Sequence, residues 1–259
     1  MAQDKWSSKQ YLMFENERTR PVRDLLSAVP SDDAREVIDL GCGPGNSTEV
    51  LARRFPTARV SGLDSSADMI AAARKRMPQV QFEVADIHTW QPATAYDVIL
   101  ANAVFQWVPN HETVFPALVS RLSEGGSLAI QMPDTMDERP HRMMRELAVD
   151  GPWADKLKDA SQARTALRSA EWYYELLQQH CATANIWRTT YYHVLKDGPD
   201  AIVEWFKGSA LRPFLDPLDE DEKRSYLARY TDLVRQTHPP LADGSVLLPF
   251  PRLFMVATR

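Results

Sequence analysis

Apolar residues along the chain follow two alternating patterns. From Glu36 onward, short apolar runs predict strands at 37–40, 60–63, 82–85, 98–101 and 127–132. Between these runs the apolar positions recur every three or four residues, as in Val50, Leu51 and Phe55, which is typical of a helix that buries one face. Strands and helices in alternation predict a parallel sheet covered by helices.

The pattern changes after Pro133. Helix-forming stretches at 134–180 and 199–238 flank a β-rich segment at 185–195, and a last strand is predicted at 253–258. Two late strands separated by such an insertion are expected to pair antiparallel at one edge of the sheet. The inserted helices are then available to cover the open end of the sheet.

Composition narrows the possible partners. The net charge is -5 and the pI is about 5.7, so the chain lacks the basic surface typical of nucleic-acid binding. No apolar run approaches a membrane span, and polar residues follow 1–6 where a signal peptide has its apolar core. Cys42 and Cys181 lie far apart, which favours a reducing compartment. We expect a cytoplasmic protein without nucleic-acid or membrane partners; the oligomeric state stays open.

A glycine-rich turn, Asp39-Leu-Gly-Cys-Gly-Pro-Gly45, lies between the first strand and the first helix. Glycine lacks a Cβ atom, so this backbone is able to take positive φ angles and approach a ligand closely. The turn is at the carboxyl end of a parallel strand, where open sheets bind nucleosides. Dinucleotide enzymes have a further glycine one position later, and here Asn46 stands there, which disfavours a dehydrogenase.

Polar residues follow the next strands in the same way. Asp64, at the end of the second strand, is placed to accept hydrogen bonds from both ribose hydroxyls of a nucleoside. Asp86 and Ile87 follow the third strand, where they are expected to meet an adenine edge, and Asn102 ends the fourth. A lone aspartate at such a place more often caps the next helix or turn. Together with the glycine turn, the set favours a nucleoside site.

These residues, in this order, resemble the class I S-adenosylmethionine-dependent methyltransferases over 37–132. Further motifs resemble the trans-aconitate 2-methyltransferase family through nearly the whole chain, with 138–170 the exception. Those motifs are Tyr11-Leu-Met-Phe, Glu17-Arg-Thr-Arg-Pro21, Asp64-Ser-Ser, Phe105-Gln-Trp107, Gln131-Met-Pro-Asp134, Ile186-Trp-Arg-Thr-Thr-Tyr-Tyr-His193, Leu211-Arg-Pro213 and Phe250-Pro-Arg-Leu-Phe254.

The resemblance implies an α/β, Rossmann-like fold: a mostly parallel seven-stranded sheet with an antiparallel edge strand, helices on both faces and a helical cap from late insertions. It implies one methyltransferase domain, 1–259. The nucleotide-binding core is expected at about 30–135 and a substrate cap at about 1–29, 136–180 and 199–245. The cofactor-binding residues expected for S-adenosylmethionine are Asp39, Gly41, Gly43, Gly45, Asn46, Asp64, Ser65, Met69, Asp86, Ile87, Asn102 and Trp107.

The family's reaction is methyl transfer to a carboxylate of trans-aconitate, a tricarboxylate, giving the monomethyl ester and S-adenosylhomocysteine. A carboxyl group with a pKa of about 4 is ionised at neutral pH, so no catalytic residue is expected and positioning is the main task. Neither His111 nor His193 lies in a motif that implies proton abstraction. No compact group of histidine, cysteine and carboxylate residues has metal-ligand spacing, so no metal is predicted.

Arginine is the residue best suited to grip several carboxylates, because its planar fork makes two parallel hydrogen bonds. A lone arginine is more often solvated or paired at the surface, so its neighbourhood must decide. The residues predicted to bind the substrate are Tyr11, Arg20, Arg188, Tyr191, Arg212 and Arg252.

Two other functions stay open on the sequence. A methyltransferase for another small carboxylic acid has the same cofactor residues, and an acceptor that is a hydroxyl or carbon calls for a base. A non-catalytic module that binds S-adenosylmethionine as a signal also keeps an intact glycine turn. Turnover on a panel of acids discriminates among these alternatives.

Overall fold

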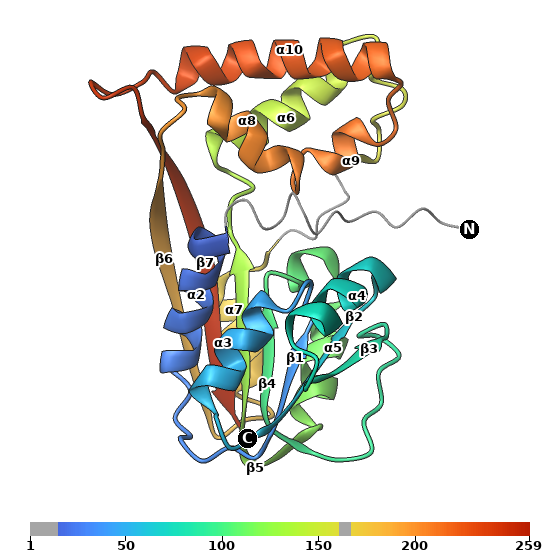
Figure 1. The fold of residues 1–259 in the computed structure, drawn as a ribbon, viewed down its shortest axis with the longest axis vertical. Coiled ribbons are helices and arrows are strands. Elements are labelled where there is room, and N and C mark those ends of the chain that lie inside the picture. The colour runs from blue at the N-terminus through green and yellow to red at the C-terminus, as the bar shows by residue number, and fades with distance from the viewer. Residues whose placement is uncertain (1–14, 161–166) are drawn as a thin grey trace. The chain divides into compact units, whose positions relative to one another are not determined.

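The computed structural model describes residues 15–160 and 167–259, and the chain divides into two compact units (Figure 1). Of the described residues, unit 1 comprises 15–133, Leu167–Thr189 and Leu253–Arg259. Unit 2 comprises 134–160 and Thr190–Arg252. The glycine-rich turn belongs to unit 1.

Five parallel strands form most of the sheet of unit 1. They are β1 (Glu36–Leu40), β2 (Arg59–Asp64), β3 (Gln81–Val84), β4 (Tyr96–Asn102) and β5 (Leu122–Pro133). The full sheet has the order β3-β2-β1-β4-β5-β7-β6, in which β1 is paired in parallel with both β2 and β4. Since these three strands are parallel neighbours, their carboxyl ends lie next to one another. The chain order reverses beside β1, which is where open sheets bind ligands.

The two late strands complete the other edge of the sheet. β6 (Thr183–Leu195) is outermost, and β7 (Val246–Thr258) lies between it and β5. β7 runs antiparallel to β5, because Arg259 N donates to Gly126 O and Gly125 N donates to Arg259 O. The predicted seven-stranded, mostly parallel sheet with an antiparallel late strand is confirmed.

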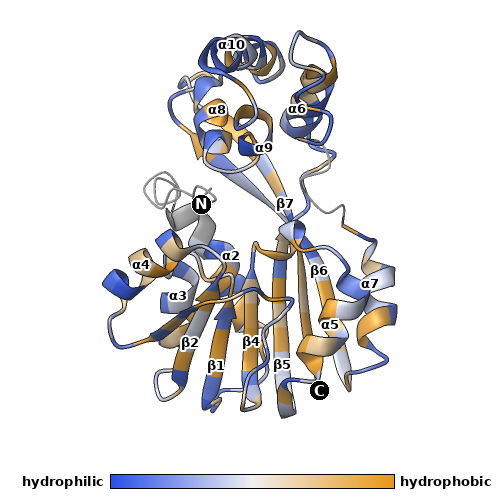
Figure 2. Cartoon of the chain, turned by 90° about the vertical axis from the view of Figure 1, so that its right-hand side faces the viewer, coloured by the Kyte–Doolittle hydropathy of each residue, from blue (hydrophilic) through white to orange (hydrophobic). Residues whose placement is uncertain are grey.

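Helices cover both faces of this sheet. α2 (Glu15–Ser27), α3 (Asn46–Arg54) and α4 (Ala67–Arg76) pack on one face. α5 (His111–Val119) and α7 (Ala170–Leu177) pack on the other. The central strands are apolar along most of their length, as Figure 2 shows for β1, β4 and β5. Strands buried on both faces read as continuous apolar runs, which is why the sequence predicted them.

The sequence predicts Asn46 as the cap of the first of these helices after β1, Ser65 as the cap of the next, and Gly125 with Gly126 as the end of α5, and all three predictions are wrong. Asn46 is the first residue of α3 rather than its cap; the cap is Gly45, whose φ of 89° is left-handed. The cap of α4 is Ser66, whose hydroxyl accepts from Met69 N, and not Ser65. Gly125 and Gly126 do not end α5, because that helix stops at Val119 and both glycines lie within β5.

Unit 2 contains α6 (Arg139–Val149), α8 (Asp200–Lys207), α9 (Arg212–Leu215) and α10 (Glu220–Thr237), with parts of β6 and β7. Tyr226 and Tyr230 of α10 are fully buried, and their hydroxyls donate to Met144 O at 2.8 Å and Pro140 O at 3.3 Å. These bonds satisfy both buried phenols and fix α10 against α6.

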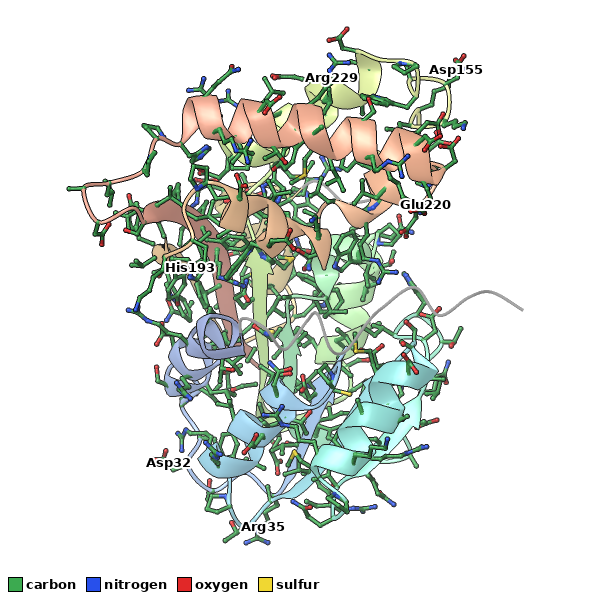
Figure 3. All side chains as sticks on the ribbon, turned by 45° about the horizontal axis from the view of Figure 1, so that its top comes forward. Asp32, Arg35, Asp155, His193, Glu220 and Arg229 are labelled. Atoms are coloured by element: carbon green, nitrogen blue, oxygen red, sulfur yellow. The ribbon has the colours of Figure 1, made fainter. Side chains whose placement is uncertain are left out.

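Charged side chains lie on the outer face of α10, including Glu220 and Arg229 (Figure 3). Arg229 donates to Asp150 Oδ2 at 2.9 Å, just beyond the end of α6. Asp219 and Glu222 form a capping box that satisfies backbone N–H groups at the start of α10. Among the described helices, none is long and apolar enough to cross a membrane.

Candidate functional site

The glycine turn after β1 has a backbone that only glycine adopts easily. Gly41, Gly43 and Gly45 have φ angles of 65°, 54° and 89°. A Cβ atom on Gly41 would lie 2.5 Å from Cγ2 of Val104, so the segment after β4 packs directly against the turn. Burial raises the pKa of the Cys42 thiol above its usual range, which makes Cys42 a packing residue rather than a nucleophile.

Asp39 is the penultimate residue of β1, and its carboxyl group is fully buried. Burial raises its pKa to about 7, the hydroxyls of Ser47 and Thr48 oppose this rise, and the charge of Asp64 adds to it. Both hydroxyls donate to Oδ2, each at 2.7 Å, while Oδ1 has no hydrogen-bond partner among the described residues. The group is therefore held in place with one oxygen available to a donor from a ligand.

Asp64 ends β2 beside the turn. One carboxylate oxygen accepts from Gly43 N and the other from Ser66 N, both at 2.9 Å. These bonds join the glycine turn to the start of α4 and fix the carboxylate.

The other predicted cofactor residues fall into two groups. Asn46, Met69 and Asn102 are buried, and Asn102 Oδ1 also has no hydrogen-bond partner in the described part of the chain. The second group is more accessible: Ser65 and Asp86 are exposed, and Ile87 and Trp107 are half-buried. Asp86 lies in the turn after β3, where its Oδ1 accepts from His88 N at 2.9 Å.

Two buried acceptor atoms, Asp39 Oδ1 and Asn102 Oδ1, and the glycine turn show which kind of cofactor fits this end of the sheet. An unpaired buried acceptor costs about 1–3 kcal/mol unless a ligand brings a donor. Asp39 Oδ1 and Asn102 Oδ1 both lack a donor within the described residues, and they belong to neighbouring strands at the same end of the sheet. A ligand that is rich in N–H and O–H groups, and part of which lies against the backbone of the glycine turn, fits this end of unit 1.

The structure does not bring the predicted substrate residues together within one unit. Arg20 on α2 and Arg188 on β6 are exposed side chains of unit 1. Tyr191, Arg212 and Arg252 belong to unit 2, and Tyr11 lies outside the described residues.

Within unit 2, Arg252 has the environment least like that of a surface arginine. It is 4% exposed and its guanidinium lies 4.7 Å from the centroid of the Phe250 ring. By contrast, Arg212 on α9 lies 3.9 Å from Asp216, four residues later, in a partly exposed pair. A buried cation of the first kind is the better candidate for an anionic ligand.

The two candidate histidines have structural contacts. Phe105 O, an obligatory acceptor, lies 2.9 Å from His111 Nε2, so that nitrogen carries the proton. Burial lowers the pKa of His111, and Tyr173 donates its hydroxyl to Nδ1 at 2.8 Å. His193 is buried in unit 2 and stacks on Trp205 with a centroid distance of 4.5 Å. Neither ring is placed as a general base.

Sequence reasoning missed Ser47, Thr48 and Val104. Ser47 and Thr48 lie on the first turn of α3, so their hydroxyls directly after a glycine turn were a signal for contact with Asp39. Val104 had no such signal, because an apolar residue after a strand reads as ordinary core.

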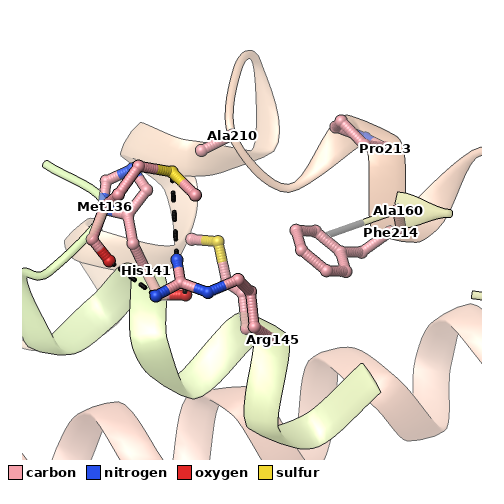
Figure 4. A pocket seen from close by; sticks show the side chains of 8 residues that line it. Met136, His141, Arg145, Ala160, Ala210, Pro213 and Phe214 are labelled. Carbon is pink, nitrogen blue, oxygen red and sulfur yellow. Dashed lines mark hydrogen bonds between the residues drawn. The ribbon is translucent and has the colours of Figure 1, made fainter. Parts of the chain in front are cut away.

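A small cavity in unit 2 is lined by His141 and Arg145 (Figure 4). Arg145 donates to Met136 O at 2.8 Å, which fixes its guanidinium in the wall. The space inside it for the centres of water-sized molecules is about 20 Å³, which is enough for about one water molecule. In the described parts of the chain, no three His, Cys, Asp or Glu side chains gather as metal ligands.

Known proteins match the chain along its length. A family model described as "Methyltransferase domain" matches residues 31–198. A protein of Rhodopseudomonas palustris (strain BisB18) named trans-aconitate 2-methyltransferase is 54% identical over 98% of this chain and 99% of its own. A protein of the same name from Azoarcus sp. (strain BH72) is 53% identical over the same shares.

Solved structures share the fold at low identity. The YcgJ protein from Bacillus subtilis superposes with a TM-score of 0.61 at 11% identity, covering 93% of this chain and 98% of that one. A phosphoethanolamine N-methyltransferase of Haemonchus contortus gives 0.57 at 16% identity, covering 93% of this chain and 52% of that one. Given the domain match and the full-length relatives, the chain belongs to the methyltransferases and, among them, to the trans-aconitate 2-methyltransferase family.

Proposed function

We propose that this chain transfers a methyl group from S-adenosylmethionine to a carboxylate of trans-aconitate, giving the monomethyl ester and S-adenosylhomocysteine. The observation that carries the proposal is identity of 50–54% over at least 98% of the chain with relatives of that name. The glycine turn, Asp39 and Asp64 supply the matching cofactor chemistry. We place the reaction in the cytoplasm, where the free thiols of Cys42 and Cys181 stay reduced.

The reaction needs alignment more than acid–base chemistry. When bound, S-adenosylmethionine supplies an electrophilic methyl group on a positively charged sulfur. With the cofactor in place, a carboxylate oxygen of the substrate would form the new O–CH₃ bond as the C–S bond broke, and the electron pair of that bond would stay on sulfur. The carboxylate is already ionised at neutral pH, so no proton moves. Holding both reactants in line contributes roughly 7–11 kcal/mol to lowering the barrier.

The residues of unit 1 divide the binding of the cofactor between them. Gly41, Gly43 and Gly45 let the backbone approach its methionine part, and Asp39 accepts from its ammonium group. Asp64 and Ser65 hold the ribose, while Asp86 and Ile87 flank the adenine. The further contacts that we assign to cofactor binding come from Asn46, Met69, Asn102 and Trp107.

Arg252 is the substrate residue with the strongest support. Its burial strengthens its attraction for a carboxylate, because a low local dielectric screens charge less than water does. A charge-assisted hydrogen bond from an arginine contributes about 1.5–3 kcal/mol. The assignments of Tyr11, Arg20, Arg188, Tyr191 and Arg212 to substrate binding stay predictions.

Methyl transfer from labelled S-adenosylmethionine to trans-aconitate, cis-aconitate, isocitrate, citrate and a malonyl thioester tests the proposal. We expect the highest kcat/KM for trans-aconitate. Turnover restricted to another acid keeps the methyltransferase and rejects this substrate. Tight cofactor binding without turnover on any acid supports the non-catalytic module instead.

A further inference from the structure

Gln106 lies in a turn that packs against the glycine-rich turn. It is the middle residue of η2 (Phe105–Trp107), which follows the carboxyl end of β4. In the β1 and β4 ladder Leu40 is paired with Ala101, so the next residues, Gly41 and Asn102, are level with each other. Val104 covers Gly41 so closely that a Cβ atom there would lie 2.5 Å from Cγ2 of Val104. The turn that carries Gln106 is therefore part of the same end of the sheet.

The backbone of this turn is strained and firmly held. Ala103 has a φ of 56°, a left-handed conformation that is unfavourable for a residue with a side chain. Ala103 N donates to Gln131 O at 2.8 Å, and Gln106 Nε2 donates to Ala103 O at 2.7 Å. His111 Nε2 donates to Phe105 O at 2.9 Å. A strained residue such as Ala103, held in place by several hydrogen bonds, is typical of a segment that positions a side chain for a ligand.

The side-chain oxygen of Gln106 is the group presented. The bond to Ala103 O fixes the orientation of the amide, because exchanging nitrogen and oxygen would set two acceptors against each other. Gln106 is 4% exposed, yet its Oε1 is buried without a hydrogen-bond partner among the described residues. Asp39 Oδ1 and Asn102 Oδ1, from the adjacent strand ends, share this state.

The chemistry of the two reactants decides which one binds Gln106. Ionised trans-aconitate offers only acceptors, so it has no donor for a buried carbonyl oxygen. S-adenosylmethionine carries donors, and its ammonium group brings three N–H bonds and a positive charge. Three unpaired acceptors, one of them on a buried carboxyl group, match such a group in number and charge.

We propose that Gln106 is a cofactor-binding residue whose side-chain carbonyl accepts a hydrogen bond from the ammonium group of S-adenosylmethionine. The assignment rests on the proposed methyltransferase function. It is separable from the substrate assignment, because it concerns binding of the cofactor in the absence of any acid.

Isothermal titration with two ligands tests the assignment. S-adenosylhomocysteine keeps the ammonium group, while 5′-methylthioadenosine keeps the adenine, ribose and sulfur but lacks the amino-acid part. For Gln106→Met we expect affinity for S-adenosylhomocysteine to fall about 10- to 100-fold, the loss typical of a hydrogen bond to a charged group. Affinity for methylthioadenosine should stay within about twofold of wild type.

Equal losses for the two ligands would mean that Gln106 only supports the turn through Ala103, and would overturn the proposal, as would unchanged affinity for both. Gln106→Glu is the matched variant, because a protonated glutamic acid is able to donate to Ala103 O and still accept from an ammonium. We expect it to keep the wild-type preference for S-adenosylhomocysteine over methylthioadenosine. Loss of that preference in Gln106→Glu would also contradict the proposal, even if Gln106→Met failed to fold.

Discussion

Asp39 shows how one buried carboxyl group links pH to both stability and binding. Its pKa is 3.8 in an ordinary setting and about 7 in the folded protein, mainly because burial penalises the charged form. Between these values the folded state holds more protons than the unfolded state. The stability contributed by this group is therefore complete below about pH 4 and is lost as pH rises through 7.

The same proton competes with the cofactor. An ammonium group binds the charged carboxylate, so only the deprotonated fraction of Asp39 is competent. We expect the Kd of S-adenosylhomocysteine to rise about tenfold for each pH unit below 7, because each unit reduces the charged fraction of Asp39 about tenfold. In Asp39→Asn the affinity should be lower and independent of pH from 5.5 to 8. Titration calorimetry across this range checks both statements, and an equal pH slope in the variant would contradict them.

At the scale of the element, the glycine turn owes its function to two separate properties. Gly41 has both a left-handed φ of 65° and a close neighbour, Val104. Gly125 has a similar φ of 74° in β5, but a Cβ atom there meets nothing within 4 Å. The two glycines therefore separate backbone strain from close approach.

We predict that Gly41→Ala lowers the free energy of unfolding by about 1–3 kcal/mol more than Gly125→Ala, since only the first adds a steric clash. Gly41→Ala should also abolish binding of S-adenosylhomocysteine, while Gly125→Ala should leave it unchanged. Urea unfolding and calorimetry measure the two effects. Equal costs for the two substitutions would show that the contact with Val104 relaxes freely.

At the scale of the whole molecule, the negative net charge of the chain contrasts with the anionic substrate that we propose. The net charge of -5 describes the entire surface, whereas a buried arginine sets the local potential. Arg252 and Arg229 are both arginines of unit 2, one buried and one in a surface pair with Asp150. They form a matched pair for substitution.

We expect Arg252→Met to raise the KM for trans-aconitate about 10- to 100-fold and to leave the Kd of S-adenosylhomocysteine unchanged, because we assign its guanidinium to the acid and not to the cofactor. Arg229→Met should change neither value, since exposed pairs contribute little. Steady-state kinetics and calorimetry check the division. If Arg252→Met weakened cofactor binding as well, its role would be structural.

The sequence alone predicted the strands of the first half of the chain, because strands buried on both faces must be apolar throughout. It also placed Asp39, Asp64 and Asn102 at strand ends, since element order decides where a parallel sheet presents its carboxyl ends. The glycines of the turn also predicted its positive φ angles, because glycine is the residue that adopts such a backbone without strain.

The tertiary structure decided the rest. The packing of Val104 on Gly41 and the hydroxyls on Asp39 depend on side chains that meet only after folding, as do the buried oxygen of Gln106 and the pairing of His111 with Tyr173. The caps are Gly45 and Ser66 rather than Asn46 and Ser65, because the path of the folded backbone decides which residue precedes the first helical turn. Arginine spacing gave no distinction between Arg252 and Arg212, since burial is a property of the fold and not of the local sequence.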